Sequence, residues 1–159
     1  MMKLLPSKRP RLTTLLLVAS CLVFIGAVSQ DSVVLRRQLM ENNNSTIANS
    51  LNKAIKEKNF AEVEGNCNVI LENMERVLDF FPAGSLSENS RAKPEIWAKW
   101  GEFSKHPANV RKAAQELAAA AKGRDEEAVK VKFKALGEAC KGCHDSFRFP
   151  KPKVGEDFR

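Results

Sequence analysis

In residues 63–81, VEGNCNVILENMERVLDFF, apolar side chains recur at alternating steps of four and three residues. This spacing puts them on one face of an α-helix, so the segment predicts an amphipathic helix with one buried side. The apolar positions are Val63, Cys67, Ile70, Met74, Val77 and Phe81. Pro82-Ala83-Gly84-Ser85 follows directly and is expected to end the helix.

A segment on the N-terminal side shows the same kind of period less regularly. Its apolar positions are Leu35, Leu39, Ile47, Leu51 and Ala54. The run Asn42-Asn43-Asn44-Ser45 interrupts it with residues of poor helix propensity. We therefore expect a first helix that is bent near this run.

Two further helices are predicted on the C-terminal side. Pro94 suits the first position of a helix, where its missing amide proton costs nothing, and His106-Pro107 is expected to kink or split that helix. Gly123 is interpreted as its C-terminal cap and Asp125 as the N-cap of the last helix, which ends at Phe149-Pro150. The apolar positions of the third helix are Ile96, Trp97, Trp100, Phe103, Val110, Ala114, Leu117 and Ala121. Those of the last helix are Val129, Phe133, Leu136, Cys140, Cys143 and Phe147.

Four amphipathic helices joined by short loops bury their apolar faces most simply in an antiparallel arrangement. No segment shows the alternation typical of a strand. The sequence therefore predicts an all-α fold, an antiparallel four-helix bundle.

The N-terminal segment has the composition of an export signal. A basic start is followed by an apolar run from Leu12 to Val28 and by the small-x-small pattern Ala27-Val28-Ser29. We predict a signal peptide over 1–29 and an exported, periplasmic domain over 30–159, with a disordered tail from about residue 150. Two alternatives stay open: the apolar run is kept as a membrane anchor, or Val18-Ala19-Ser20-Cys21 is a lipoprotein signal that places a lipid on Cys21.

The charge of the chain argues against nucleic acid as a partner. The whole sequence carries 26 basic and 19 acidic residues, a net charge of +7. Four of the basic residues and none of the acidic ones precede Gln30, which leaves 22 against 19, or +3. A nucleic-acid-binding domain would need a concentrated basic face.

Cys140-Lys141-Gly142-Cys143-His144 has the Cys-x-x-Cys-His spacing of a haem c attachment site. Two thiols at this spacing can each add to a vinyl group on one edge of the porphyrin and form thioethers. The adjacent histidine then lies beneath the ring, where its imidazole can ligate the iron. We predict one covalent haem c, attached through Cys140 and Cys143, with His144 as an iron ligand.

The same residues allow other interpretations. Zinc could be held by Cys67, Cys140, Cys143 and His144, since these supply the four ligands of a structural site. The cysteine pair could also be a thioredoxin-like redox motif or a plain disulfide, although the first expects a βαβ context. For the remaining side chains we expect a buried inert thiol at Cys67, core packing at Trp97 and Trp100, and a capping or solvent-facing His106.

Three further patterns are separated along the chain, and the haem motif itself lies near the C-terminus. The patterns are Arg36-x-x-x-Met40, Phe81-Pro82-Ala83-Gly84-Ser85 and Lys93-Pro94-Glu95-Ile96-Trp97. With these features the chain resembles the cytochrome c′ family from Arg36 to Arg148.

The resemblance implies roles for further residues. His144 is expected to be the proximal iron ligand, and Arg148 to lie beside the proximal haem face. Arg36 is expected near a haem propionate, and Met40 on the distal side of the iron.

Whether Met40 bonds the iron decides between two functions that the resemblance allows. If Met40 crowds the sixth position without bonding, the iron is five-coordinate and high-spin and binds small gases such as nitric oxide or carbon monoxide. If Met40 ligates the iron, the protein is a low-spin electron carrier for periplasmic redox partners. The pattern Phe81-Pro82-Ala83-Gly84-Ser85 favours the gas-binding function. A third possible function is a sensor in which gas binding shifts a monomer–dimer equilibrium.

The sequence shows no catalytic acid–base constellation, so we expect a binding protein and not an enzyme. The resemblance also implies a homodimer formed through the first two helices. After signal cleavage we expect no membrane association.

Overall fold

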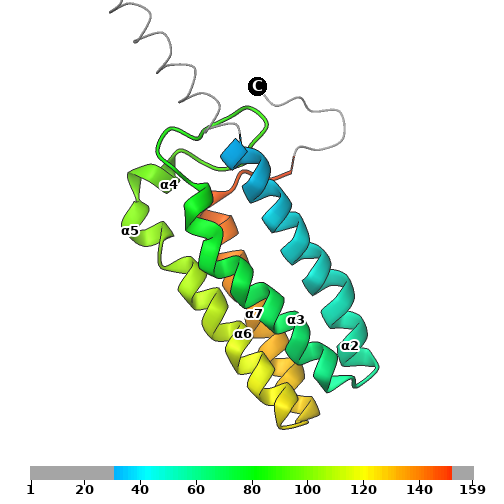
Figure 1. The fold of residues 1–159 in the computed structure, drawn as a ribbon. Helices are drawn as coiled ribbons and strands as arrows, with labels where there is room; N and C mark the ends of the chain where they lie inside the picture. Colours follow the sequence, from blue (N-terminus) through cyan, green and yellow to red (C-terminus); the bar gives the residue numbers. More distant parts are fainter. Residues whose placement is uncertain (1–30, 152–159) are drawn as a thin grey trace, which may run out of the picture.

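The computed structural model describes residues 31–151 and is almost entirely helical in this range (Figure 1). Strands are absent from the same range, where the only β-type pairing is a single bridge between Ala92 and Arg148. The elements are a helix over 31–45, the π-helix η1 (Thr46–Leu51), α2 (Asn52–Lys56), α3 (Phe60–Arg76), the 3-10 helix η2 (Val77–Phe80), α4 (Glu95–Ala98), α5 (Trp100–Phe103), α6 (His106–Lys122) and α7 (Glu126–Phe147). The predicted leader and the predicted disordered tail beyond Lys151 lie outside the described residues.

Four helical rods make the bundle. The first runs through the helix over 31–45, η1 and α2, the second through α3 and η2, and α6 and α7 are the third and fourth (Figure 1). Short turns reverse the chain at Lys58 and at Arg124, which both adopt left-handed backbone conformations with φ of 56° and 55°. The predicted all-α antiparallel four-helix bundle is thus confirmed.

Side-chain caps fix where α3 and α7 begin. Asn59 accepts a hydrogen bond from the backbone N–H of Glu62 at 3.2 Å, and Asp125 accepts one from Ala128 at 3.0 Å. Each cap satisfies an amide that has no partner inside the helix. Asp125 is therefore the predicted N-cap of α7. Gly123 ends α6, as predicted, but the left-handed residue is the following Arg124.

The first rod differs from the prediction in what it buries. Leu35, expected in the core, is 44% exposed, while Arg36, Asn43 and Thr46 are buried. The irregular part follows the asparagine run as η1, next to which Asn52 Nδ2 donates to the carbonyl oxygen of Ala48 at 3.0 Å. A side chain that bonds a nearby backbone carbonyl competes with the α-helical ladder, which accounts for the wider turn.

The third predicted helix is divided into three parts. Pro94 directly precedes α4, the backbone at Lys99 separates α4 from α5, and α6 begins at His106 with a proline in its first turn. The predicted break at His106-Pro107 is therefore confirmed, and the break at Lys99 was not foreseen. Of the aromatic face predicted here, Phe103 is buried, but Trp100 is 39% exposed, so its assignment to the core is wrong.

A membrane-crossing helix would need a longer apolar stretch than any that residues 31–151 contain.

Candidate functional site

The predicted haem motif lies near the C-terminal end of α7. Cys140, Cys143 and His144 occupy helical positions i, i+3 and i+4, so they share one side of the helix. All three side chains are partly buried, and both cysteines are free thiols. The chain thus presents two thiols and an imidazole together on a rigid helix.

The surroundings hold these three groups in their uncharged forms. Burial raises the pKa of the Cys140 thiol and raises that of Cys143 to about 11. Burial, followed by the nearby charges of Arg148 and Arg91, lowers the pKa of His144 to about 4. A neutral imidazole is the form that ligates a metal, and two desolvated thiols lose their ionisable proton when they become thioethers.

The competing interpretations receive no support from the geometry. Cys140 and Cys143 are not bonded to each other. In the described part of the chain, no group of three or more histidine, cysteine or acidic side chains is close enough to hold a metal ion. The zinc set that would add Cys67 is therefore not assembled.

Arg36 lies in the helix over 31–45, near the start of the first rod. Its guanidinium donates to Ser85 Oγ at 3.0 Å, to the Ser85 carbonyl oxygen at 2.7 Å and to Ser90 Oγ at 2.7 Å. It also stacks on the Phe81 ring, 5.0 Å from the centroid. Ser85 reaches this place through a turn in which Gly84 has a φ of +76° and Ser85 N–H donates to the Pro82 carbonyl oxygen.

Arg36 is a buried cation without a carboxylate partner among residues 31–151. Its Nε is buried and makes no hydrogen bond. A buried charge of this kind is expensive unless an anion compensates it. The unpaired Nε therefore fits a carboxylate supplied by a bound group, as a haem propionate would be.

Met40 follows Arg36 by one helical turn and is partly buried against the apolar core. Asn43 lies one turn further on and is buried. Asn73 of α3 donates to the side-chain oxygens of Asn43, at 2.7 Å, and Asn42, at 2.8 Å. The sequence did not predict this amide cluster, because polar residues in a predicted bend carry no signal that they will be buried.

The segment before α4 is tied to the end of α7. Lys93 Nζ donates to the carbonyl oxygens of Asp145 and Ser146, at 3.2 and 3.3 Å, in the last turn of α7. Arg148 is the extended residue that follows α7, and its backbone N–H donates to the His144 carbonyl oxygen at 3.1 Å. Arg148 is exposed and remains close enough to His144 to lower the pKa of the imidazole.

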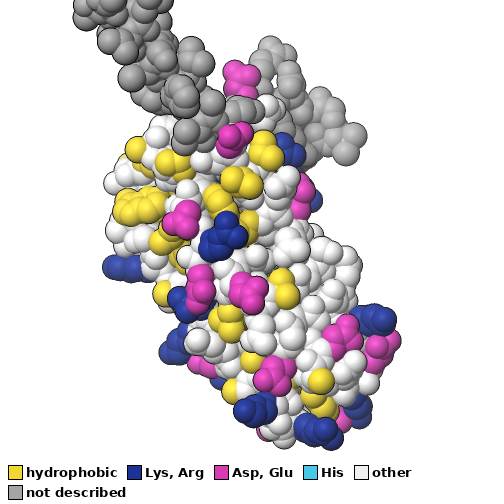
Figure 2. Space-filling view, viewed as in Figure 1, with side chains coloured by type: hydrophobic (Ala, Val, Ile, Leu, Met, Phe, Trp, Pro, Cys, Tyr) yellow, Lys and Arg dark blue, Asp and Glu magenta, His cyan; other side chains and the backbone are white. Residues whose placement is uncertain are grey.

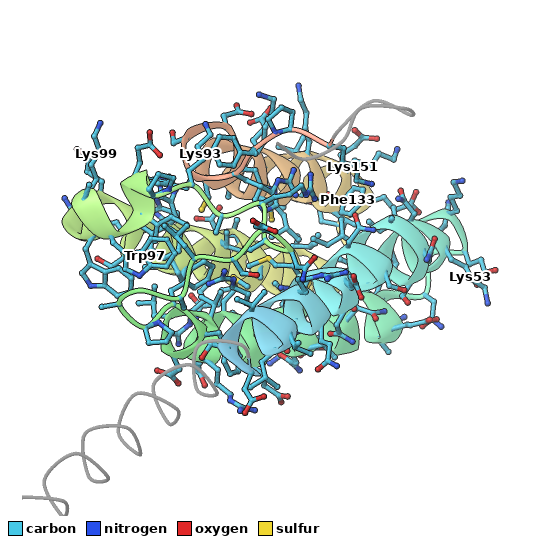
Figure 3. All side chains as sticks on the ribbon, turned by 90° about the horizontal axis from the view of Figure 1, so that it is seen from above. Lys53, Lys93, Trp97, Lys99, Phe133 and Lys151 are labelled. Atoms are coloured by element: carbon cyan, nitrogen blue, oxygen red, sulfur yellow. The ribbon has the colours of Figure 1, made fainter. Side chains whose placement is uncertain are left out.

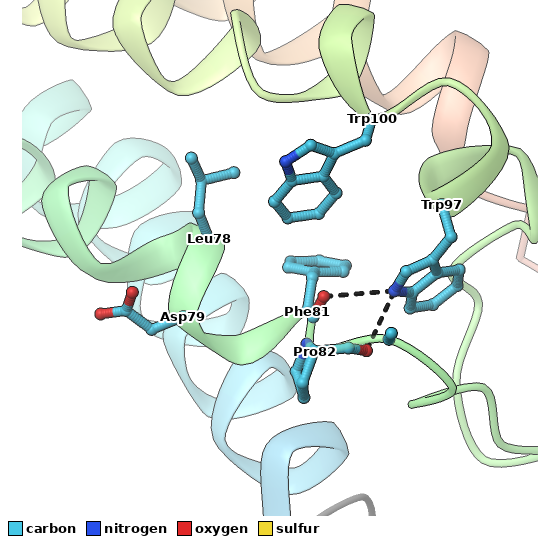
Figure 4. Close-up of a pocket in the computed structure, with 7 residues that line it drawn as sticks. Leu78, Asp79, Phe81, Pro82, Trp97 and Trp100 are labelled. Atoms are coloured by element: carbon cyan, nitrogen blue, oxygen red, sulfur yellow. Dashed lines mark hydrogen bonds between the residues drawn. The ribbon is translucent and has the colours of Figure 1, made fainter.

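Aromatic side chains form a second cluster beside the site. Phe103 makes ring contacts with Phe81, Phe147 and Trp100, with centroids 4.8, 5.4 and 5.6 Å apart. Trp97 Nε1 donates to the carbonyl oxygens of Phe81 and Pro82 (Figure 4). Through these hydrogen bonds Trp97 holds the loop that carries Ser85 in place, which is a structural role.

Two other predicted residues behave as structural side chains. Cys67 is fully buried, and burial with the nearby Glu64 raises the pKa of its thiol to about 12. This agrees with the predicted inert thiol. His106 is half-buried against the Phe147 ring, 5.5 Å between centroids, at the start of α6. It therefore packs on an aromatic ring, where the sequence predicted a capping or solvent-facing side chain.

An all-helical bundle with the Cys-x-x-Cys-His motif near the end of its last helix defines a helical c-type cytochrome. The comparisons agree. A family model described as Cytochrome C′ matches residues 31–148. The chain belongs to the cytochrome c′ family, whose members bind haem c.

Individual proteins show the extent of the similarity. The cytochrome c′ of Pararhodospirillum photometricum is 35% identical over 89 residues, which cover 55% of this chain and 71% of that protein. A cytochrome c-554 of Cereibacter sphaeroides is 34% identical over 93 residues, 55% of this chain and 69% of that protein. Among solved structures, a nitric oxide complex of a mutant cytochrome c prime from Alcaligenes xylosoxidans superposes with a TM-score of 0.69 at 24% identity, covering 77% of this chain and 97% of that one.

Proposed function

We propose that this protein is an exported cytochrome with one haem c, which it uses to bind small uncharged gases such as nitric oxide. Cys140 and Cys143 form the thioethers, and His144 is the proximal iron ligand. Arg36 pairs with a propionate through its unpaired Nε. The haem supplies an iron that can bind a diatomic gas, and the residues around it decide which side of that iron is open.

The packing of Met40 supports the gas-binding reading. Its side chain lies against the buried apolar core, in a chain region where Arg36 and Asn43 are also buried. We infer that these neighbours keep the thioether in its packed position when haem is bound. Met40 would then crowd the sixth coordination position without bonding the iron, which would be five-coordinate.

Arg148 is the proposed contact on the proximal side. It follows the last turn of α7 in an extended conformation, and its charge acts on His144. A guanidinium in that position can donate a hydrogen bond to a ligand bound on the same face of the iron.

Export supports the same function, because the covalent haem of such proteins is attached outside the bacterial cytoplasm. Residues 1–29 have the composition that predicts a signal peptide, and we propose the periplasm as the location. The solved relative from Alcaligenes xylosoxidans was described as a nitric oxide complex.

The absorption spectrum of the purified ferrous protein, before and after carbon monoxide, tests this proposal. We expect a broad high-spin spectrum that sharpens when the gas binds. Sharp low-spin bands that ignore carbon monoxide would instead establish Met40 as a ligand and electron transfer as the function. A protein without a haem spectrum, made in a host that matures c-type cytochromes, would contradict both.

Two sets of variants separate the parts of the proposal. Replacing Cys140 and Cys143 by serine should let acid–acetone extraction remove the haem, while Cys67→Ser should leave the haem covalent. Met40→Ala should speed carbon monoxide binding without changing the resting spin state. A change of resting spin state in Met40→Ala would show that the thioether is a ligand.

A further inference from the structure

One end of the bundle exposes an unusual share of apolar side chains. Residues 31–151 contain seven exposed large hydrophobic residues, and five of them lie at the end that holds the loop after η2, α4, α5 and the start of the first rod (Figures 1 and 2). These five are Val34, Leu35, Leu86, Trp100 and Phe149, each between 39% and 47% exposed. We call this surface the loop end.

A shallow apolar hollow opens at the loop end. It measures about 500 Å³ and lies between η2, the following loop and the indoles of Trp97 and Trp100 (Figure 4). Asp79 is the one charged side chain in its lining, which otherwise consists of Leu78, Phe81, Pro82, Ala83 and the two tryptophans. A half-exposed tryptophan above an apolar hollow is typical of side chains that sit at an interface between water and lipid.

The positive charge of the described residues is also concentrated at the loop end. The segments 31–37, 79–105 and 141–151 contain nine basic and six acidic residues, a net charge of +3, of which the buried Arg36 supplies one. The rest of the described chain contains 11 of each and is neutral. In the view from above, Lys93, Lys99 and Lys151 all lie along one side of the molecule (Figure 3). The carboxylates of a bound haem would offset part of this charge, so the apolar side chains make the larger contribution.

The chain enters the bundle at the same end. Residue 31 begins the first rod there (Figure 1), and only Ser29 and Gln30 separate it from the apolar run that finishes at Val28. If that run is retained as an anchor, the connecting residues span at most about 10 Å. The loop end would then be held against the bilayer by the geometry of the chain alone.

We propose that the loop end is a membrane-docking surface, which rests on the surface of a bilayer that contains anionic lipids. Leu86, Trp100 and Phe149 enter the headgroup region, and the exposed Lys99 and Lys151 face the lipid phosphates. This departs from the absence of membrane association expected from the sequence. The five apolar residues come from four separate segments, so only the fold brings them to one end.

A second copy of the chain is the main competing occupant. The net positive charge of the loop end argues against it, because two copies meeting through this end would bring like charges together. An anionic lipid surface complements this charge. The proposal does not depend on gas binding.

Thiol footprinting tests the docking surface on the haem-loaded, full-length protein as its host exports it. Leu86→Cys at the loop end and Val131→Cys on α7, 63% exposed, are labelled with a water-soluble maleimide. Cys67 gives little background, because it is buried and its thiol pKa is about 12. Labelling is measured peptide by peptide, so that Cys21 of a retained leader is counted separately. The measurement is repeated with vesicles of phosphatidylcholine alone and of phosphatidylcholine with phosphatidylglycerol.

We expect the anionic vesicles to slow labelling of Leu86→Cys about tenfold at a lipid concentration that binds about nine-tenths of the protein, and to leave Val131→Cys unchanged. Trp100→Glu should abolish the protection of Leu86→Cys, whereas Val69→Glu should not. Since this readout reports orientation, it applies whether or not the leader has been removed.

Three results would overturn the proposal. Labelling of Leu86→Cys that vesicles do not change excludes docking at this end. Equal protection of both cysteines means that the molecule has no preferred orientation on lipid. Protection that grows with protein concentration in the absence of vesicles assigns the surface to a second copy. Failure of haem attachment would appear separately, as additional labelling of Cys140 and Cys143.

Discussion

At the scale of single residues, Arg36 carries the clearest information about the site. It is the only charged side chain that is buried in residues 31–151, and all its hydrogen-bond partners there are neutral oxygens of Ser85 and Ser90. In the apoprotein the buried charge is uncompensated, whereas a propionate would compensate it. The contribution of Arg36 to the free energy of unfolding should therefore depend on whether haem is bound.

Arg36→Met should lower the free energy of unfolding of the haem-loaded protein by about 2 kcal/mol more than that of the apoprotein. Urea unfolding of both forms measures the difference. Arg37→Met is the matched control, since Arg37 is the exposed neighbour in the same helix. Equal losses in the two forms would mean that Arg36 has no anionic partner in the haem-loaded protein.

His144 gives the apoprotein a dependence on pH. Its pKa is lowered from 6.5 to about 4 in the folded chain, mainly by burial, so the unfolded chain binds more protons between these values. Stability should therefore fall as the pH drops from about 6.5 to about 4. Because the side chain is partly exposed, we expect a loss of about 1 to 2 kcal/mol. His144→Gln should flatten this part of the profile in urea titrations, and an unchanged slope would contradict the assignment.

At the scale of elements, the outcome of the sequence predictions depended on how regular each period was. The strict alternation of four and three residues from Val63 to Phe81 correctly predicted the helical segment formed by α3 and η2. Cys67 is buried, as that spacing predicted. In the first rod the pattern failed at Leu35, because the buried face is set by Arg36 and Asn43, whose partners come from distant parts of the chain. No local period carries that information.

The predictions for the site had the same limits. The haem motif is local, so its placement on one side of α7 followed from spacing. Ser85 and Ser90 as partners of Arg36, and Lys93 as the cap of α7, depend on a loop whose path the sequence does not specify. A proline and glycine pattern predicts where such a loop turns, but not what it contacts.

The N-cap of α7 is an element whose contribution can be measured. Asp125 accepts a hydrogen bond from the Ala128 amide at 3.0 Å, and its carboxylate also faces the positive end of the helix. Asp125→Ala should lower the free energy of unfolding by about 1 kcal/mol, while Asp125→Asn, which keeps the accepting oxygen, should cost much less. Urea unfolding provides the comparison, and equal losses for both variants would show that the hydrogen bond is not what stabilises the helix end.

At the scale of the whole molecule, the four rods contribute unequally to the core. α6 alone buries Val110, Ala113, Ala114, Leu117 and Ala121. The helix over 31–45 buries two apolar side chains, Val33 and Leu39, beside the polar Ser32, Arg36 and Asn43. Further along the same rod, η1 and α2 bury Leu51 and Ala54 completely. Because burial of apolar area is the main stabilising term, the helix over 31–45 is the part of the first rod that the protein alone holds less strongly.

This imbalance predicts that the haem completes the bundle. In the apoprotein, backbone amides of residues 33–45 should exchange with deuterium faster than those of α3 and α6, since the first rod can open without exposing the main core. Haem attachment to α7, with Arg36 and Met40 on its other side, should slow exchange in the first rod by an order of magnitude or more and change α6 little. Hydrogen exchange followed by mass spectrometry on both forms resolves the two regions. If the first rod is protected to the same extent with and without haem, then the contacts of Arg36 with Ser85 and Ser90 already hold it, and the haem is bound by a preformed bundle.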